Sequence, residues 1–190
     1  MPTVVRIDLA ALPWTGLDGG IDATHEITML LRLLELGRRS GHRFHFFSTA
    51  ASLRAFPMSA EAILTEGHVL DWLADGDEAT DEVLEAFLEN GVQPTGAGLT
   101  RSEFLELPDW VKFTCGPGQG GTQVKHFGLR IEPLRDALLA GQTYAGWLAA
   151  AGVPSDESVV ALDPASLFGL DPTLKDFSAW LNQQKLITLP

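Results

Sequence analysis

Aspartates stand at or near the ends of three apolar segments of this 190-residue sequence. Asp8 follows the segment 4–7, Asp71 follows 68–70, and Asp163 follows 158–162. Carboxylates that converge at strand ends can raise one another's pKa for acid–base chemistry, or together bind a hard cation. They can equally cap the loops and helices that follow. We treat Asp8 as a candidate catalytic residue, and Asp71 and Asp163 as candidate substrate-binding residues.

Other residues whose types could support binding or catalysis are weaker candidates for a functional site. The glycines of 116–121 have the spacing G-x-G-x-x-G, but no helical pattern follows them, so we predict a loop and not a dinucleotide site. His42 and His45 are three residues apart beside a strand, which directs their side chains to opposite faces and argues against a shared zinc ion. Cys115 is the only cysteine and cannot form an internal disulfide. This is consistent with a reducing, cytoplasmic location.

The composition is that of one globular domain covering 1–190, with 45% hydrophobic and 20% charged residues. The net charge of −12 argues against nucleic acid as a partner. No apolar run approaches the length that spans a bilayer, and the first residues do not resemble a signal peptide. We therefore expect no membrane association. The oligomeric state is left open.

Most of the negative charge lies in one segment, 69–109, which carries eleven acidic residues against the single base Arg101. A solvated helix face explains such a segment most simply. A surface that binds a basic partner is the alternative.

Apolar segments alternate with helical patterns along the chain. We predict strands at 4–7, 44–47, 68–72, 94–99, 110–115, 158–162 and 186–189, with helices mostly between them. Such alternation is typical of parallel strands joined by helical crossovers. The expected fold is therefore α/β, a distorted (β/α) barrel of about seven mostly parallel strands, in which the carboxyl ends of the strands surround the site.

Three stretches resemble the polysaccharide deacetylases, the NodB-type carbohydrate esterases. They are V-R-I-D-L at 5–9, the run from Leu33 to Ser48 that contains H-R-F-H-F-F-S, and I-L-T-E-G-H-V-L at 63–70. The segment 174–189 is also similar to the last helix and strand of that family. The resemblance implies a distorted barrel that removes acyl groups with a divalent metal, and a catalytic role for Asp8.

Several functional positions depart from the family pattern. The metal-binding aspartate expected just after Asp8 is replaced by Leu9 and Ala10. The two metal-binding histidines would fall near Leu73 and Asp77, and the histidine that donates a proton would fall at Leu162. An aliphatic side chain can neither coordinate a metal nor transfer a proton. The resemblance therefore implies a degenerate member without the family's metal, in which Asp8 and Asp77 are the candidate ligands if a divalent cation is bound after all.

Three functions follow as hypotheses. The first is a non-catalytic binding or regulatory protein for a carbohydrate or small polar ligand, for which aromatic residues near strand ends supply stacking surfaces: Trp14, Trp72 and Trp110. The second is an active hydrolase of acyl-amide or ester bonds with a rebuilt carboxylate metal site. The third is a protein-interaction module that uses the acidic segment 69–109.

Overall fold

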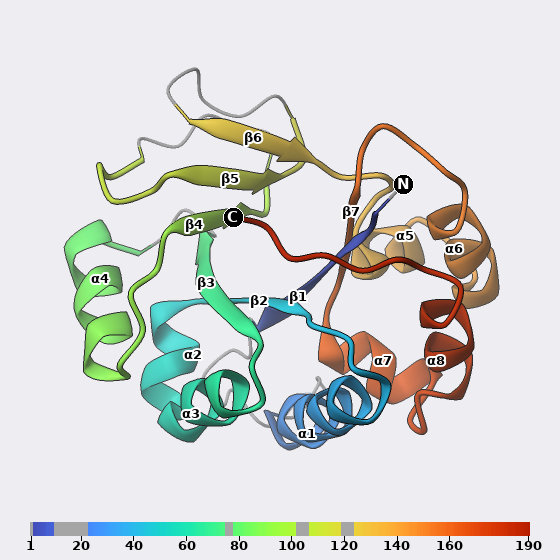
Figure 1. Ribbon diagram of the computed structural model, residues 1–190, viewed down its shortest axis with the longest axis horizontal. Helices are drawn as coiled ribbons and strands as arrows, with labels where there is room; N and C mark the ends of the chain where they lie inside the picture. The colour runs from blue at the N-terminus through green and yellow to red at the C-terminus, as the bar shows by residue number, and fades with distance from the viewer. Residues whose placement is uncertain (1, 10–22, 75–77, 102–106, 119–123) are drawn as a thin grey trace.

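The computed structural model describes residues 2–9, 23–74, 78–101, 107–118 and 124–190. Its centre is a seven-stranded sheet with the order β6-β5-β4-β3-β2-β1-β7, and every neighbouring pair is parallel (Figure 1). The strands are β1 (Val4–Leu9), β2 (His45–Ser48), β3 (Val69–Ala74), β4 (Gly96–Leu99), β5 (Phe113–Gly116), β6 (Lys125–Gly128) and β7 (Val159–Leu162).

The two edges of the sheet approach each other just beyond β6. Leu129 forms an isolated parallel bridge with Val159 of β7, and the Arg130 amide donates to the Val159 carbonyl at 2.7 Å. The sheet is thus a nearly closed barrel, which confirms the distorted (β/α) barrel expected from the alternation of apolar and helical segments.

Helices connect most of the strands. They are α1 (Ala23–Ser40), α2 (Ala50–Ala55), α3 (Pro57–Thr65), α4 (Thr80–Glu89), α5 (Leu134–Leu139), α6 (Tyr144–Ala151), α7 (Pro164–Leu170) and α8 (Lys175–Leu181). Two short ones begin at side-chain caps: Thr49 accepts from the Ser52 amide at the start of α2, and Asp163 accepts from the Ser166 amide at the start of α7. None of the described helices has the length and apolar content needed to cross a membrane.

Alternate residues of each strand serve two separate cores. The outward-facing side chains, such as Ile7, Phe46 and Leu162, pack with the helices in the larger core. The inward-facing ones form a smaller apolar cluster inside the barrel: Val4, Phe47, Leu73, Phe113, Cys115, Val159 and Leu189, with Phe127 and Leu129 against it. The barrel interior is therefore filled by side chains and also contains the polar groups described below.

The chain end differs from the prediction. We expected a closing strand at 186–189, but this segment contributes only one isolated bridge, between Leu186 and Thr3. The seventh strand is instead β6, which the sequence pattern did not reveal. The C-terminal segment crosses in front of the strands from α8 towards β4 (Figure 1), and its Leu189 packs into the inner cluster. The segment covers one end of the barrel without extending the sheet.

Candidate functional site

Asp8 lies near the carboxyl end of β1 and is held by Arg6 from the same strand. The Arg6 Nε donates to Asp8 Oδ1 at 2.6 Å, and its Nη2 donates to Oδ2 at 2.9 Å. Residues two apart in a strand share a face, so both side chains lie on the inner face of the barrel. The Arg6 side chain is 2% exposed and that of Asp8 is 18% exposed. Asp8 is therefore the partly accessible member of a two-point ion pair.

Arg6 is fixed by further contacts inside the barrel. Its Nη1 donates to the carbonyl oxygens of Leu99 at 3.0 Å and Cys115 at 2.5 Å. The guanidinium carbon lies 5.2 Å from the centre of the Phe47 ring. Gly98 leaves room for this group, because a Cβ there would come within 2.7 Å of Phe47 and 3.1 Å of the guanidinium carbon. Arg6 thus positions Asp8 by joining β1 to β4 and β5.

Opposing influences set the protonation of this pair. Burial raises the pKa of the Asp8 carboxyl, the Arg6 guanidinium opposes that rise, and the carboxylates of Asp163 and Asp136 add to it. For Arg6, burial lowers the pKa, but the Asp8 carboxylate and Cys115 together outweigh this and the net pKa is raised. Burial also raises the pKa of the Cys115 thiol to about 11, so this cysteine is a poor nucleophile.

Asp163 combines a capping role with an unused oxygen. Its Oδ1 accepts from the Ser166 amide at 2.7 Å, whereas its Oδ2 is buried and has no hydrogen-bond partner among the described residues. It directly follows Leu162 of β7, whose strand pairs with β1. Asp163 therefore lies at the same end of the barrel as Asp8, and unlike Asp71 it has an acceptor with no described partner, although this oxygen is itself buried.

Asp71 has a different environment from the other two aspartates. It lies in the middle of β3, is 2% exposed, and its Oδ2 is 2.8 Å from the His45 Nε2. Its Oδ1 accepts from the amides of Thr95 and Gly96 at 2.6 and 2.9 Å. These partners occupy the carboxylate and join β2, β3 and β4. The expected substrate contact through Asp71 has no accessible oxygen to support it in this conformation.

The tryptophans form part of the outer packing. Trp72 is 3% exposed and belongs to the larger core, and its ring centre is 5.5 Å from that of Trp110, which is partly exposed. The Trp72 indole donates to Glu78 at 3.4 Å. Of this pair, Trp110 alone retains an exposed surface for stacking. Trp14, also expected to contact substrate, and Asp77, the second candidate metal ligand, lie outside the described residues.

The described residues do not fit a divalent metal at this site. No group of three or more histidine, cysteine or acidic side chains is placed to hold an ion anywhere in the described part of the chain. Both oxygens of Asp8 already bind Arg6. Leu73 lies in the inner apolar cluster and Leu162 in the outer core, where neither supplies a ligand or a proton. The described residues therefore supply no metal-based chemistry at this site.

The sequence reasoning missed Arg6 as a functional residue. The apolar run 4–7 predicts a buried strand and by itself assigns Arg6 no role. A charge inside a buried strand requires a partner, and an acid two residues away on the same face is the nearest one. That spacing is the signal that could have identified the Arg6–Asp8 pair.

Solved structures of carbohydrate esterases and deacetylases have the same architecture as this chain. A family 4 carbohydrate esterase from Streptomyces lividans superposes with a TM-score of 0.58 over 98% of this chain and 91% of the esterase, at 11% identity. This chain has the polysaccharide deacetylase fold. A family 4 pseudoenzyme from Bacillus anthracis gives a TM-score of 0.58 at 12% identity, covering 97% of this chain and 62% of the pseudoenzyme. A peptidoglycan N-acetylglucosamine deacetylase gives 0.57 at 14% identity, covering 100% and 86%.

No family model and no curated protein sequence matches the chain. The polysaccharide deacetylase fold is thus established by three-dimensional similarity at identities of 11–14%. The solved structures with this fold include both deacetylases and a pseudoenzyme.

Proposed function

We propose that this protein binds a carbohydrate or another small polar ligand at the carboxyl end of its barrel without hydrolysing it. The observation that carries the proposal is the ion pair of Asp8, whose two oxygens are both held by Arg6. A carboxylate held in this way is fixed in position, and the adjacent guanidinium charge opposes both cation binding and proton uptake by it.

The surroundings of Asp8 support the same function. Leu73 and Leu162 stand where the resemblance to the deacetylases places a metal ligand and a proton donor, and both are packed in apolar cores. Asp163 offers a buried oxygen with no partner among the described residues, which suits a hydroxyl or amide donor of a ligand. The same fold in a pseudoenzyme from Bacillus anthracis is consistent with a barrel that persists without catalysis.

Calorimetry with chito-oligosaccharides, with and without zinc, tests the binding. We expect a saturable heat with the wild type that weakens severalfold in Asp163→Asn, because the single amide oxygen retains the cap to Ser166 while the unpartnered oxygen is replaced by an NH2 group that cannot accept a hydrogen bond. Asp156→Asn, an exposed carboxylate on a loop, is the matched control and should bind like the wild type. Absence of a binding heat with every oligosaccharide would exclude chito-oligosaccharides as ligands of this protein.

Acetate release in the same samples tests the absence of hydrolysis. We expect none above the background of buffer and metal. Metal-dependent release that is lost in Asp8→Asn, in a variant that still unfolds cooperatively, would overturn the non-catalytic part of the proposal.

A second candidate is an active hydrolase in which Asp8 transfers a proton. The observation in its favour is the raised pKa of Asp8, which burial and the carboxylates of Asp163 and Asp136 produce. A carboxyl with a raised pKa is better suited to general acid catalysis near neutral pH. The acetate assay separates the two candidates, because this one requires turnover that falls as Asp8 ionises.

A further inference from the structure

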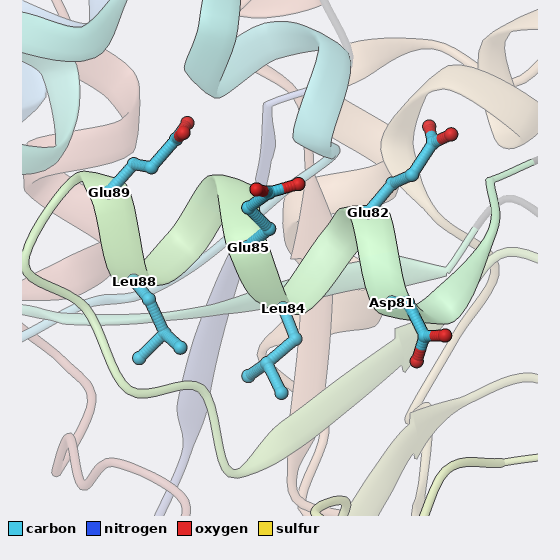
Figure 2. Close-up of a pocket in the computed structure, with 6 residues that line it drawn as sticks. All are labelled: Asp81, Glu82, Leu84, Glu85, Leu88 and Glu89. Atoms are coloured by element: carbon cyan, nitrogen blue, oxygen red, sulfur yellow. The ribbon is translucent and has the colours of Figure 1, made fainter.

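The exposed side of α4 combines leucines with carboxylates. Asp81, Leu84, Glu85 and Leu88 have the spacing i, i+3, i+4, i+7 and lie on the exposed side of the helix, with the two leucines along one half of that side and Glu85 along the other. We call this stripe, with Glu82 and Glu89 along its border, the α4 face. Figure 2 shows Leu84 and Leu88 pointing to one side, with Glu82, Glu85 and Glu89 directed to the other. The six residues line a shallow, open hollow of about 540 Å³.

The buried side of α4 makes the contacts that hold this helix against the large core. Val83, Ala86 and Phe87 are fully buried in the large core. Leu88 is 54% exposed although it is apolar, and Leu84 is half-buried. The two leucines stand one helical turn apart, which is the spacing of a ridge that packs against another helix.

The carboxylates in the second half of the α4 face oppose the stability of the helix. Asp81, Glu85 and Glu89 repeat at four-residue intervals, where like charges repel. Glu89 lies in the last turn, which has no basic residue to balance the helix dipole. Within the described residues the one ion pair formed by this face is that of Glu82 with Arg54, at 3.8 Å. Asp81 and Glu82 lie in the first turn, where the helix dipole favours acids, so the cost that the fold does not offset is that of Glu85 and Glu89.

We propose that the α4 face docks a basic amphipathic helix of another protein. Leucines at i and i+4 would pack against apolar residues of that helix, and lysine or arginine side chains on its flanks would reach Asp81, Glu85 and Glu89. A second copy of this chain does not fit, because its own α4 face and its net charge of −12 would repel. This surface belongs to the helix side of the barrel and is independent of the Asp8 site.

A defined peptide tests the docking. The probe is a fluorescent synthetic helix with leucines on one face and lysines on its flanks, and a scrambled peptide of the same composition shows whether amphipathicity matters. Fluorescence anisotropy should show saturable binding of the first peptide, and binding at least about tenfold weaker for the scrambled one.

Variants locate the binding site. Glu85→Gln/Glu89→Gln should weaken binding by about five- to tenfold and raise the melting temperature slightly, because repulsion within α4 is relieved. Leu88→Ser should weaken binding without changing its salt dependence. Glu61→Gln/Glu132→Gln removes the same charge from exposed positions elsewhere and should bind like the wild type. Equal weakening in this control, or equal binding of the scrambled peptide, would overturn the proposal.

Discussion

His45 and Asp71 form a buried pair inside the barrel, with the imidazole Nε2 2.8 Å from the carboxylate and side-chain exposures of 0% and 2%. An ionised carboxylate only accepts, so the Nε2 atom carries the hydrogen. The imidazole stacks on Phe47 with ring centres 4.5 Å apart. Asp71 also accepts the Thr95 and Gly96 amides, so one carboxylate holds three neighbouring strands together.

Removing this carboxylate should therefore destabilise the barrel. We expect Asp71→Ala to lower the free energy of unfolding by about 3 kcal/mol, since two amides and the imidazole lose their acceptor in a buried site. Asp71→Asn retains one carbonyl oxygen for the amides and should cost about half as much. Urea denaturation measures both. An Asp71→Ala variant as stable as the wild type would show that the His45–Asp71 pair does not stabilise the fold.

The Arg6–Asp8 pair should behave as a coupled unit. Arg6→Met leaves the Asp8 carboxylate without its cation in a mostly buried site, for which we expect a loss of about 3 kcal/mol. Asp8→Asn should also destabilise, which means that activity data for this variant need a parallel stability measurement. The double variant Arg6→Met/Asp8→Leu should recover part of the loss, because apolar pairs can replace buried ion pairs. Additive losses in the double variant would contradict the coupling.

Gly98 and Gly169 should respond to alanine with opposite signs. A Cβ at Gly98 would press on Phe47 and on the guanidinium of Arg6, so we expect Gly98→Ala to cost about 2 kcal/mol. Gly169 lies in α7 with open space around it, and alanine there should add about 0.5–1 kcal/mol. Thermal unfolding of the two variants measures the contrast. A neutral Gly98→Ala would show that Arg6 moves freely.

Acid should destabilise the protein through His68. Its Nδ1 accepts from the Phe44 amide at 3.1 Å, and burial, together with the Arg43 charge, lowers its pKa to about 4. Between pH 6.5 and pH 4 the unfolded chain therefore binds a proton that the native state does not. Stability should be complete near pH 7 and fall by about 2 kcal/mol as the pH drops through this range.

His68→Asn provides the control for this pH dependence. Asparagine can still accept from the Phe44 amide but does not titrate, so the stability of this variant should vary less between pH 6.5 and pH 4. Urea midpoints at half-unit pH intervals measure the difference. Identical slopes for the variant and the wild type would assign the acid sensitivity to another group.

The sequence predicts the parts of this fold that bury continuous apolar strands. The runs ending at Asp8 and Asp163 are β1 and β7, because strands buried on both faces have near-continuous apolar sequences. β6 escaped the prediction because its four residues, Lys125 to Gly128, include one large apolar side chain, Phe127. Asp71 was placed at a strand end, but β3 continues to Ala74 and leaves it inside the barrel.

The segment 186–189 shows that a strand-like composition does not by itself place a segment in the sheet. Its residues suit a strand, but β1 already has β2 on one side and β7 on the other, so no free edge remains beside it. The segment can pair only with Thr3, ahead of β1: the Ile187 amide donates to the Thr3 carbonyl at 3.0 Å, and the Thr3 amide donates to the carbonyl of the preceding Lys185 at 2.7 Å. Similarly, the hydrogen bonds from Arg6 to the carbonyls of Leu99 on β4 and Cys115 on β5 depend on how the strands are aligned with one another. The sequence of a single strand does not encode this alignment.

The contact between Thr3 and the segment around Leu186 has a consequence for biosynthesis. On the ribosome, β1 emerges first, yet β7 and Leu186 are translated more than 150 residues later, which takes roughly 10–30 seconds at usual elongation rates. During that interval one edge of β1 is bare, and bare strand edges recruit other chains. The edge of β1 is thus expected to need protection, for example by a chaperone, until β7 and Leu186 have emerged from the ribosome.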